Sequence, residues 1–328
     1  MRFTEYDADD ADLLEAARAI VNAVQAAETP WLPQLTAHRW AMQVRYGWDS
    51  SPERHLIAWA DGVPVAVAAL ELGEWDNLDL AWIDLCVHPE LRRRGHGSAL
   101  LAHLLELARE AGRTKVGLSG WELPATVAFA RHHGFKRAAE EIYRVVRPRE
   151  LARGFVDDAY TEAAAFAEDY ELLRFVGQTP DELLVAVSEM TVAINDAPID
   201  DLDIEDEAFP AERIRSYEDA TVNSGHRLYR VIARHRESGE LAGHTVVAVD
   251  AETPEIAHQH DTAVVRAHRG HRLGLLVKAD LMRWLAVAEP QVESIDTWNA
   301  ESNEKMIEVN ERLGYTRVAR QLEFQRQI

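Results

Sequence analysis

The chain has 328 residues, with 35 Lys and Arg against 56 Asp and Glu, which gives a formal charge of −21. This length predicts about two domains, and an apolar fraction of 47 % supplies a core for each. The acidic balance argues against nucleic acid or an anionic membrane as a partner, because phosphate binding needs a field of Lys and Arg, and the single cysteine, Cys86, excludes an internal disulfide and a Cys-based zinc site.

The N-terminus lacks the apolar segment of a signal peptide. No run of about 18 apolar residues is present to cross a membrane. We therefore expect a cytoplasmic protein without a membrane partner and without a bound metal.

In chain order, the first half predicts two helices, three strands, a glycine-bearing turn, a helix, a strand, a short helix and a closing strand. Helical spacing of apolar residues and period-two alternation distinguish the two classes. The ranges are 13–27 and 35–46 (helices), 55–60, 64–72 and 80–87 (strands), 100–108 (helix), 115–121 (strand), 124–133 (helix) and 142–146 (strand).

The second half predicts the same order from its third element onward. The ranges are 229–234, 241–249 and 256–265 (strands), 275–288 (helix), 294–298 (strand) and 303–313 (helix), followed by terminal strands. The segment between the halves is rich in Ala and acid, which is compatible with part of it being helical.

Paired landmarks indicate that the two halves are copies of one plan. Five pairs share an offset of 177 residues: Asp84/Asp261, Val87/Val264, Arg92/Arg269, Gly97/Gly274 and Trp121/Trp298. Each copy closes with Gly and an aromatic residue, at Gly134 and Gly314. We therefore predict two domains, residues 1–152 and 153–328, with an α/β fold of mixed, mostly antiparallel sheets flanked by helices.

The motif that carries chemistry is a strand, then Arg-x-x-Gly-x-Gly, then a helix. A helix N-terminus offers unpaired N–H groups and the positive end of a dipole, and glycine lets the backbone approach a phosphate closely. The segment from Arg92 to Ser98 fits this description. It is neither a Walker loop, which needs Gly-Lys-Ser/Thr, nor a dinucleotide fingerprint, which needs a third Gly and a distant acid.

Val-x-Pro-x-x-Arg-x-x-Gly-x-Gly, a helix, a strand and a helix ending in Gly-Phe resembles the acetyl-CoA-binding core of the GNAT superfamily of N-acetyltransferases. The match is complete in Val87–Gly97 and degraded in Val264–Gly274, where Arg266 replaces the Pro and Arg272 the first Gly. The chain is therefore identified as a tandem GNAT protein.

The resemblance implies that a splayed strand pairs with the pantetheine arm and that loop amides cradle the pyrophosphate. The implied cofactor residues of the first half are Leu85, Cys86, Val87, Arg92, Arg93, Arg94, Gly95, His96, Gly97 and Ser98. Those of the second half are Ala263, Val264, Val265, Arg269, Gly270, His271, Arg272, Leu273, Gly274, Leu275 and Asn303.

The resemblance also places candidate catalytic residues in the second half. His258 and His260 lie eleven and nine residues before the motif Arg269, where some family members carry a His-x-His proton relay. Alternation puts both on one face of a strand, and imidazole titrates near neutral pH. Asn310 stands at the place of the family's general-acid Tyr, and Ala130 stands there in the first half. Neither half carries the standard acid.

Other interpretations of these residues stay open. The two histidines could be ordinary strand residues, and Asn303 could merely start a helix. Asp84 and Asp261 could be features of the fold. An acidic run could attract a cationic acceptor or simply be a solvated loop; it comprises Asp196, Asp200, Asp201, Asp203, Glu205, Asp206 and Glu207.

The sequence thus predicts an acetyl-CoA-dependent N-acetyltransferase acting by direct attack on a primary amine, which we expect to be a small cationic molecule. Catalysis is expected in the second half, and the better cofactor loop in the first. The alternatives are a CoA-binding pseudoenzyme or sensor without turnover, and a nucleotide-binding regulator. A monomer and a homodimer are both compatible with a duplicated chain.

Overall fold

The computed structural model describes residues 1–51 and 53–328 and divides them into two compact units. Unit 1 comprises Met1–Ala139, Asp201–Glu205 and Gln321–Ile328. Unit 2 comprises Glu140–Asp200 and Asp206–Arg320. The first division therefore falls 13 residues before the predicted boundary at 152, and the C-terminal segment is counted with unit 1.

Strand pairing explains this division. From Ile142 to Val146, strand β6 (Lys136–Val146) pairs with β11 of unit 2. From Gln321 onward, strand β12 (Thr316–Gln327) pairs with β5 of unit 1. Each unit thus completes its sheet with a strand that lies far away in the sequence, and linear motif analysis does not register such an exchange.

Unit 1 contains the elements β1 to α4, and its strand order is β1-β2-β3-β4-β5 followed by the second part of β12. The elements are β1 (Arg2–Tyr6), α1 (Ala11–Glu28), α2 (Ala37–Tyr46), β2 (Glu53–Ala60), β3 (Val63–Glu71), β4 (Leu80–Val87), the 3-10 turn η1 (Pro89–Leu91), α3 (His96–Glu110), β5 (Lys115–Trp121) and α4 (Pro124–His132). All described pairs are antiparallel except β4 with β5.

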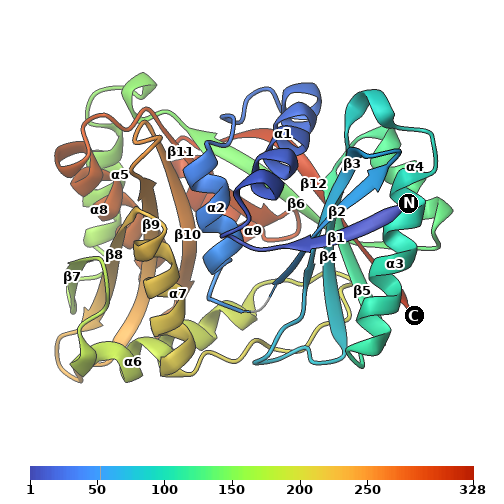
Figure 1. Cartoon of the computed structure of the whole chain (residues 1–328). Coiled ribbons are helices and arrows are strands. Elements are labelled where there is room, and N and C mark those ends of the chain that lie inside the picture. The colour runs from blue at the N-terminus through green and yellow to red at the C-terminus, as the bar shows by residue number, and fades with distance from the viewer. Residues whose placement is uncertain (52) are drawn as a thin grey trace. The chain divides into compact units, whose positions relative to one another are not determined.

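The sheet of unit 1 is covered on both faces (Figure 1). Helices α1 and α2 pack through Leu14, Ile20 and Trp40 on the face that carries Ile57 and Val67. Helix α3 covers the other face with a stripe whose helical spacing the sequence predicted: Leu100, Leu101, Leu104, Leu105 and Ala108. Gly112 ends that helix region with a φ of +78°, which a glycine adopts without strain.

Unit 2 contains the elements α5 to α9, β6 from Glu140 and β12 to Arg320. Its strand order is β6-β11-β10-β9-β8-β7. The elements are α5 (Phe155–Ala164), β7 (Tyr170–Val176), α6 (Asp181–Thr191), η3 (Val192–Asp196), α7 (Ala211–Asn223), β8 (His226–His235), β9 (Leu241–Asp250), β10 (Ile256–Val264), η4 (Arg266–His268), α8 (Leu273–Ala288), β11 (Ser294–Ala300) and α9 (Glu304–Arg312), with η2 (Pro148–Glu150) preceding α5.

The layers of unit 2 repeat those of unit 1. Helices α5 and α8 pack on one face of the sheet around Val247, Leu276 and Ile295. Helices α6 and α7 lie on the other face, where Met190 and Ile214 meet the sheet (Figure 1). As in unit 1, one described pair is parallel, β10 with β11.

The predicted α/β class with mixed, mostly antiparallel pairing is confirmed, and every predicted element is present within a few residues. Five elements were not predicted: β1, α5, β7, α6 and α7. Four of them open the second unit, where acidic residues interrupt the apolar spacing. In the described part of the chain, no helix has the length and apolarity needed to cross a bilayer.

Candidate functional site

In each unit, one strand leaves its parallel neighbour halfway along. The pairing of β4 with β5 runs from Leu80 to Ile83, and no described pair joins the two strands beyond it. The pairing of β10 with β11 stops in the same way at His258. Because both strands stay paired on their other side, one backbone edge remains for a ligand, from Asp84 to Val87 and from Gln259 to Val264.

The two loops after these strands have the same backbone conformation. Unit 1 uses two left-handed residues, Arg93 (φ +63°) and Gly95 (φ +85°). Unit 2 uses Gly270 (φ +92°) and Arg272 (φ +54°), each 177 residues later. Each loop thus has one glycine and one arginine at its left-handed positions, in opposite order. The expectation of a degraded second loop holds for the motif and is wrong for the backbone.

Arg272 is held in its left-handed conformation by contacts of its side chain. The guanidinium pairs with Glu162 of α5 and lies 3.9 Å from the ring centroid of Phe166. A left-handed conformation costs a non-glycine residue about 1 kcal/mol, and these contacts offset that cost. The Arg272 side chain is therefore engaged with unit 2 itself.

The motif arginines anchor the loops. Arg92 Nε donates to the carbonyl of Val87 at 3.0 Å, and Arg269 Nε donates to the carbonyl of Val264 at 3.1 Å. Each guanidinium also pairs with a carboxylate, Glu28 for Arg92 and Asp196 for Arg269. Both side chains thus brace the end of the splayed strand, and their predicted role in cofactor binding is indirect.

Backbone amides supply the anion site in each loop. Helix α3 begins at His96 and helix α8 at Leu273, and the first three amides of a helix have no intrahelical acceptor. These amides belong to His96, Gly97 and Ser98 in unit 1, and to Leu273, Gly274 and Leu275 in unit 2. A Cβ on Gly97 would lie 3.2 Å from Phe129 and from Val87, so glycine lets this helix start pack closely.

The remaining predicted cofactor residues lie around these amides. Arg94 and His271 are exposed on the loops. Leu85, Cys86, Val87, Val264 and Val265 are half-buried at the ends of the splayed strands, and Ala263 is buried. Burial raises the pKa of the Cys86 thiol to about 12, so Cys86 stays protonated and unreactive.

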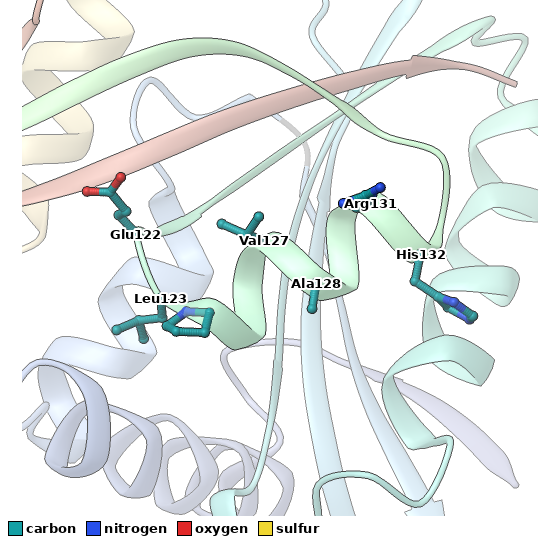
Figure 2. Close-up of a pocket in the computed structure, with 7 residues that line it drawn as sticks. Glu122, Leu123, Val127, Ala128, Arg131 and His132 are labelled. Carbon is teal, nitrogen blue, oxygen red and sulfur yellow. The ribbon is translucent and has the colours of Figure 1, made fainter.

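A hollow of about 780 Å³ lies at the start of α4 in unit 1. Figure 2 shows its lining along one side of α4, with Val127 and Arg131 one turn apart and Glu122 before the helix. Pockets of this size hold organic ligands. An apolar wall with one cation suits a ligand that is part hydrocarbon and part anion.

In unit 2, His258 forms a dyad with an aspartate. His258 Nδ1 lies 2.9 Å from Asp296 Oδ2, and Tyr143 donates from its hydroxyl to the same oxygen at 3.2 Å. Asp296 is the parallel partner of His258 on β11. A carboxylate on Nδ1 fixes the ring and leaves Nε2 for proton transfer.

His260 is on the same side of the sheet, as alternation predicted, but it is not a base. Its Nδ1 lies 2.5 Å from the hydroxyl of Tyr217 on α7. Burial, and then the nearby His258, lower the pKa of His260 to about 3. The imidazole is therefore neutral near pH 7, which corrects the expectation that both histidines titrate there. The register shift of β10 follows, between Gln259 and Thr262.

The two predicted asparagines have structural partners. Asn303 caps α9, its side chain accepting from the amide of Met306 at 3.2 Å. Asn310 is fully buried and donates from Nδ2 to Asn299 Oδ1. Among the described residues its Oδ1 has no hydrogen-bond partner. The catalytic assignment of Asn310 stays a prediction.

The acidic run splits by position. Asp196 pairs with Arg266 and Arg269 beside the second loop. Asp203 lies 3.3 Å from Lys115 in unit 1. The other members of the run are exposed, as the solvated-loop interpretation expects.

Several site residues escaped sequence analysis. Glu28, Glu162 and Tyr217 lie 43 to 110 residues from their partners, and no local pattern marks them. Asp296 carried a signal, since it precedes the landmark Trp298 by two and shares its face of the strand. The asparagines and tryptophans of that segment drew attention instead.

Comparisons with known proteins follow the same lines. Residues 20–135 match the family model described as "Acetyltransferase (GNAT) family". A protein named mycothiol acetyltransferase from Nocardiopsis dassonvillei is 33 % identical over 150 residues, 44 % of this chain and 42 % of that protein. One of the same name from Gordonia bronchialis is 28 % identical over 240 residues, 73 % of this chain and 71 % of that protein.

The chain spans only 29 to 42 % of the length of three such relatives. Among solved structures, a tandem GNAT protein from the clavulanic acid biosynthesis pathway is similar over almost the whole chain. It has a TM-score of 0.82 and 29 % identity, with 99 % of this chain and 98 % of that chain covered.

Proposed function

We propose that this chain, which carries a GNAT-family domain at residues 20–135 and the fold of a tandem GNAT protein, is an acetyltransferase that moves the acetyl group of acetyl-CoA to a primary amine. The family match and the relatives named mycothiol acetyltransferase support the reaction class. The observation that carries the proposal is the repeated unit of splayed strand, left-handed loop and helix N-terminus.

The residues present fit the proposed thioester substrate. The unpaired edges of β4 and β10 can pair with the amides of a pantetheine arm, as a neighbouring strand would. The amides that open α3 and α8 can hold a pyrophosphate. Both loops have the required backbone, so we propose one acetyl-CoA site in each unit.

Catalysis is proposed in unit 2, with His258 as the base. The amine nitrogen bonds to the thioester carbonyl carbon, the carbon–sulfur bond breaks, and the amine gives up a proton as CoA thiol forms. His258 Nε2 accepts the amine proton, while Asp296 stabilises the imidazolium and holds the ring. His260 and Tyr217 form a neutral pair beside it. The acceptor is proposed to be a small cationic amine.

Calorimetry with acetyl-CoA, followed by thiol release across a panel of amines, tests this function. Two equivalents bound with turnover of an amine would support it. His258→Ala should then lower kcat by about 10²- to 10⁴-fold and leave the acetyl-CoA affinity unchanged. The matched control, His38→Ala, removes an exposed histidine of unit 1.

Asp296→Asn provides a second test of the dyad. It should lower kcat less than His258→Ala and shift the pH profile toward higher pH, because the imidazolium loses its counter-charge. An unchanged kcat in both variants would refute the base. Binding without turnover of any amine would favour the CoA-binding pseudoenzyme, with which Ala130 and Asn310 at the acid positions agree. No binding would refute the function.

A further inference from the structure

Unit 1 holds a cluster of carboxylates that the proposed chemistry of unit 2 does not use. Glu53 on β2 is the antiparallel partner of Glu71 on β3, and Asp84 lies on β4 next to them. All three point to the face covered by α1 and α2, because Glu53 shares the alternation of Ile57, and Asp84 that of Cys86. Asp49, in the loop after α2, adds a fourth carboxylate nearby.

The cluster is not neutralised by a cation of the chain. In the described structure, neither Glu53 nor Asp84 pairs with Lys or Arg. Burial first, and then Glu71, Asp84 and Asp49, raise the pKa of Glu53 to about 7. Burial also raises the pKa of Asp84 although its side chain is accessible. A carboxylate that solvent reaches but does not fully hydrate lies in a recess.

A buried histidine is aimed into this recess. The His55 side chain is only 6 % exposed, and its Nε2 lies 3.4 Å from Glu53 Oε2. Among the described residues, neither ring nitrogen has a hydrogen-bond partner. Burial lowers the pKa of His55 to about 4, so the ring is neutral and does not balance the carboxylates. An orphaned buried polar group beside unpaired acids is costly without a ligand.

We infer that Glu53, Asp84 and His55 form a binding site for a primary ammonium group in unit 1. An ammonium carries one positive charge and three donors, which two carboxylates can satisfy. Asp84 begins the unpaired edge of β4. If acetyl-CoA binds there as proposed, the ammonium sits beside its acyl end, and unit 1 has an acceptor site of its own.

The test is calorimetry with spermidine as the probe, in 150 mM NaCl at pH 7 and without acetyl-CoA. The wild-type protein should bind spermidine, and Glu53→Gln and Asp84→Asn should each weaken binding at least about tenfold. The control Glu106→Gln, an exposed acid on α3, has the same change of net charge. Equal affinity in all four proteins would mean non-specific attraction to an acidic surface and would overturn the site.

Proton release gives a second readout. An ammonium next to Glu53 favours its ionised form, so binding at pH 7 should release about half a proton. Glu71, Asp84, Asp49, Tyr6 and Cys86 are the other titratable groups that face Glu53 and its recess. Measured as the dependence of the binding enthalpy on buffer, phosphate against MOPS, this release should vanish in Glu53→Gln. Release that persists there would refute the assignment.

The outcome is independent of turnover. Loss of acetyl-CoA binding or of unit 2 chemistry would refute the proposed function and leave spermidine binding unaffected. Absence of specific spermidine binding would refute this inference and leave His258 untouched.

Discussion

Replacing Glu53 by Gln should stabilise the protein at alkaline pH. The Glu53 side chain is 24 % exposed and lies among carboxylates of β3, β4 and the loop after α2. Its ordinary pKa is 4.5, and the fold raises it to about 7. Between these values the folded chain holds a proton that the unfolded chain releases. The free energy of unfolding therefore falls as the pH rises from about 4.5 to 7, and stays lower above it.

The magnitude follows from the shift. A rise of about 2.5 pH units corresponds to about 3 kcal/mol at 1.36 kcal/mol per unit. Partial exposure screens part of this, so we expect a loss of about 2 kcal/mol. Gln carries no proton to lose. Relative to wild type, Glu53→Gln should therefore gain about 2 kcal/mol between pH 4 and pH 8.

Urea unfolding at pH 4, 5, 6, 7 and 8 measures this gain. Glu106→Gln is the matched control, since it removes an exposed carboxylate of the same unit. A stability difference between Glu53→Gln and wild type that stays constant with pH would refute the reasoning, because the effect must follow the titration of one group. A difference of opposite slope would mean that a cation pairs with Glu53 in the folded protein.

Three further predictions concern packing and buried charge. Gly117→Ala should lower the thermal midpoint strongly, because a Cβ there would lie 2.2 Å from the ring of Trp82; adding Trp82→Ala should leave Gly117→Ala with little further cost, and equal costs in both backgrounds would disprove the clash. Lys278 is 1 % exposed and burial lowers its pKa to about 7, so wild-type stability should rise from pH 7 to pH 10 and Lys278→Met should remove this rise, with a gain of about 3 kcal/mol near pH 7; an unchanged pH profile in urea unfolding would contradict it. Asp280→Asn breaks the bidentate pair of buried Asp280 with Arg174, at 2.8 and 2.7 Å, and should cost about 3 kcal/mol in the same assay, whereas Arg174→Met should cost more than an exposed substitution only if the Asp280 charge stays buried.

The duplicated plan and its loops were readable from the sequence. Landmarks at one offset, helical spacing at Leu100–Ala108 and alternation in the strands depend only on local periodicity. Alternation also placed His258 and His260 on one face correctly. Such patterns reflect which side of an element is buried, and a single strand or helix records that in its own residues.

Tertiary structure decided which residues do chemistry. His258 and His260 look alike in sequence, but Asp296 stands beside one and Tyr217 beside the other, with a low pKa only for His260. The charge state of a side chain depends on the dielectric and the charges around it, and these come from distant segments.

The same limit applies to the strand exchange and to the second loop. The sequence showed Arg272 as a defect, whereas the fold shows a left-handed residue held by Glu162 and Phe166. The sequence by itself therefore determined the elements, their repetition and the phosphate-binding motif. Only the fold decided the pairing of β5 with β12, the anchors of the loops and the recess at Glu53, because each is made by contacts between residues that no local pattern connects.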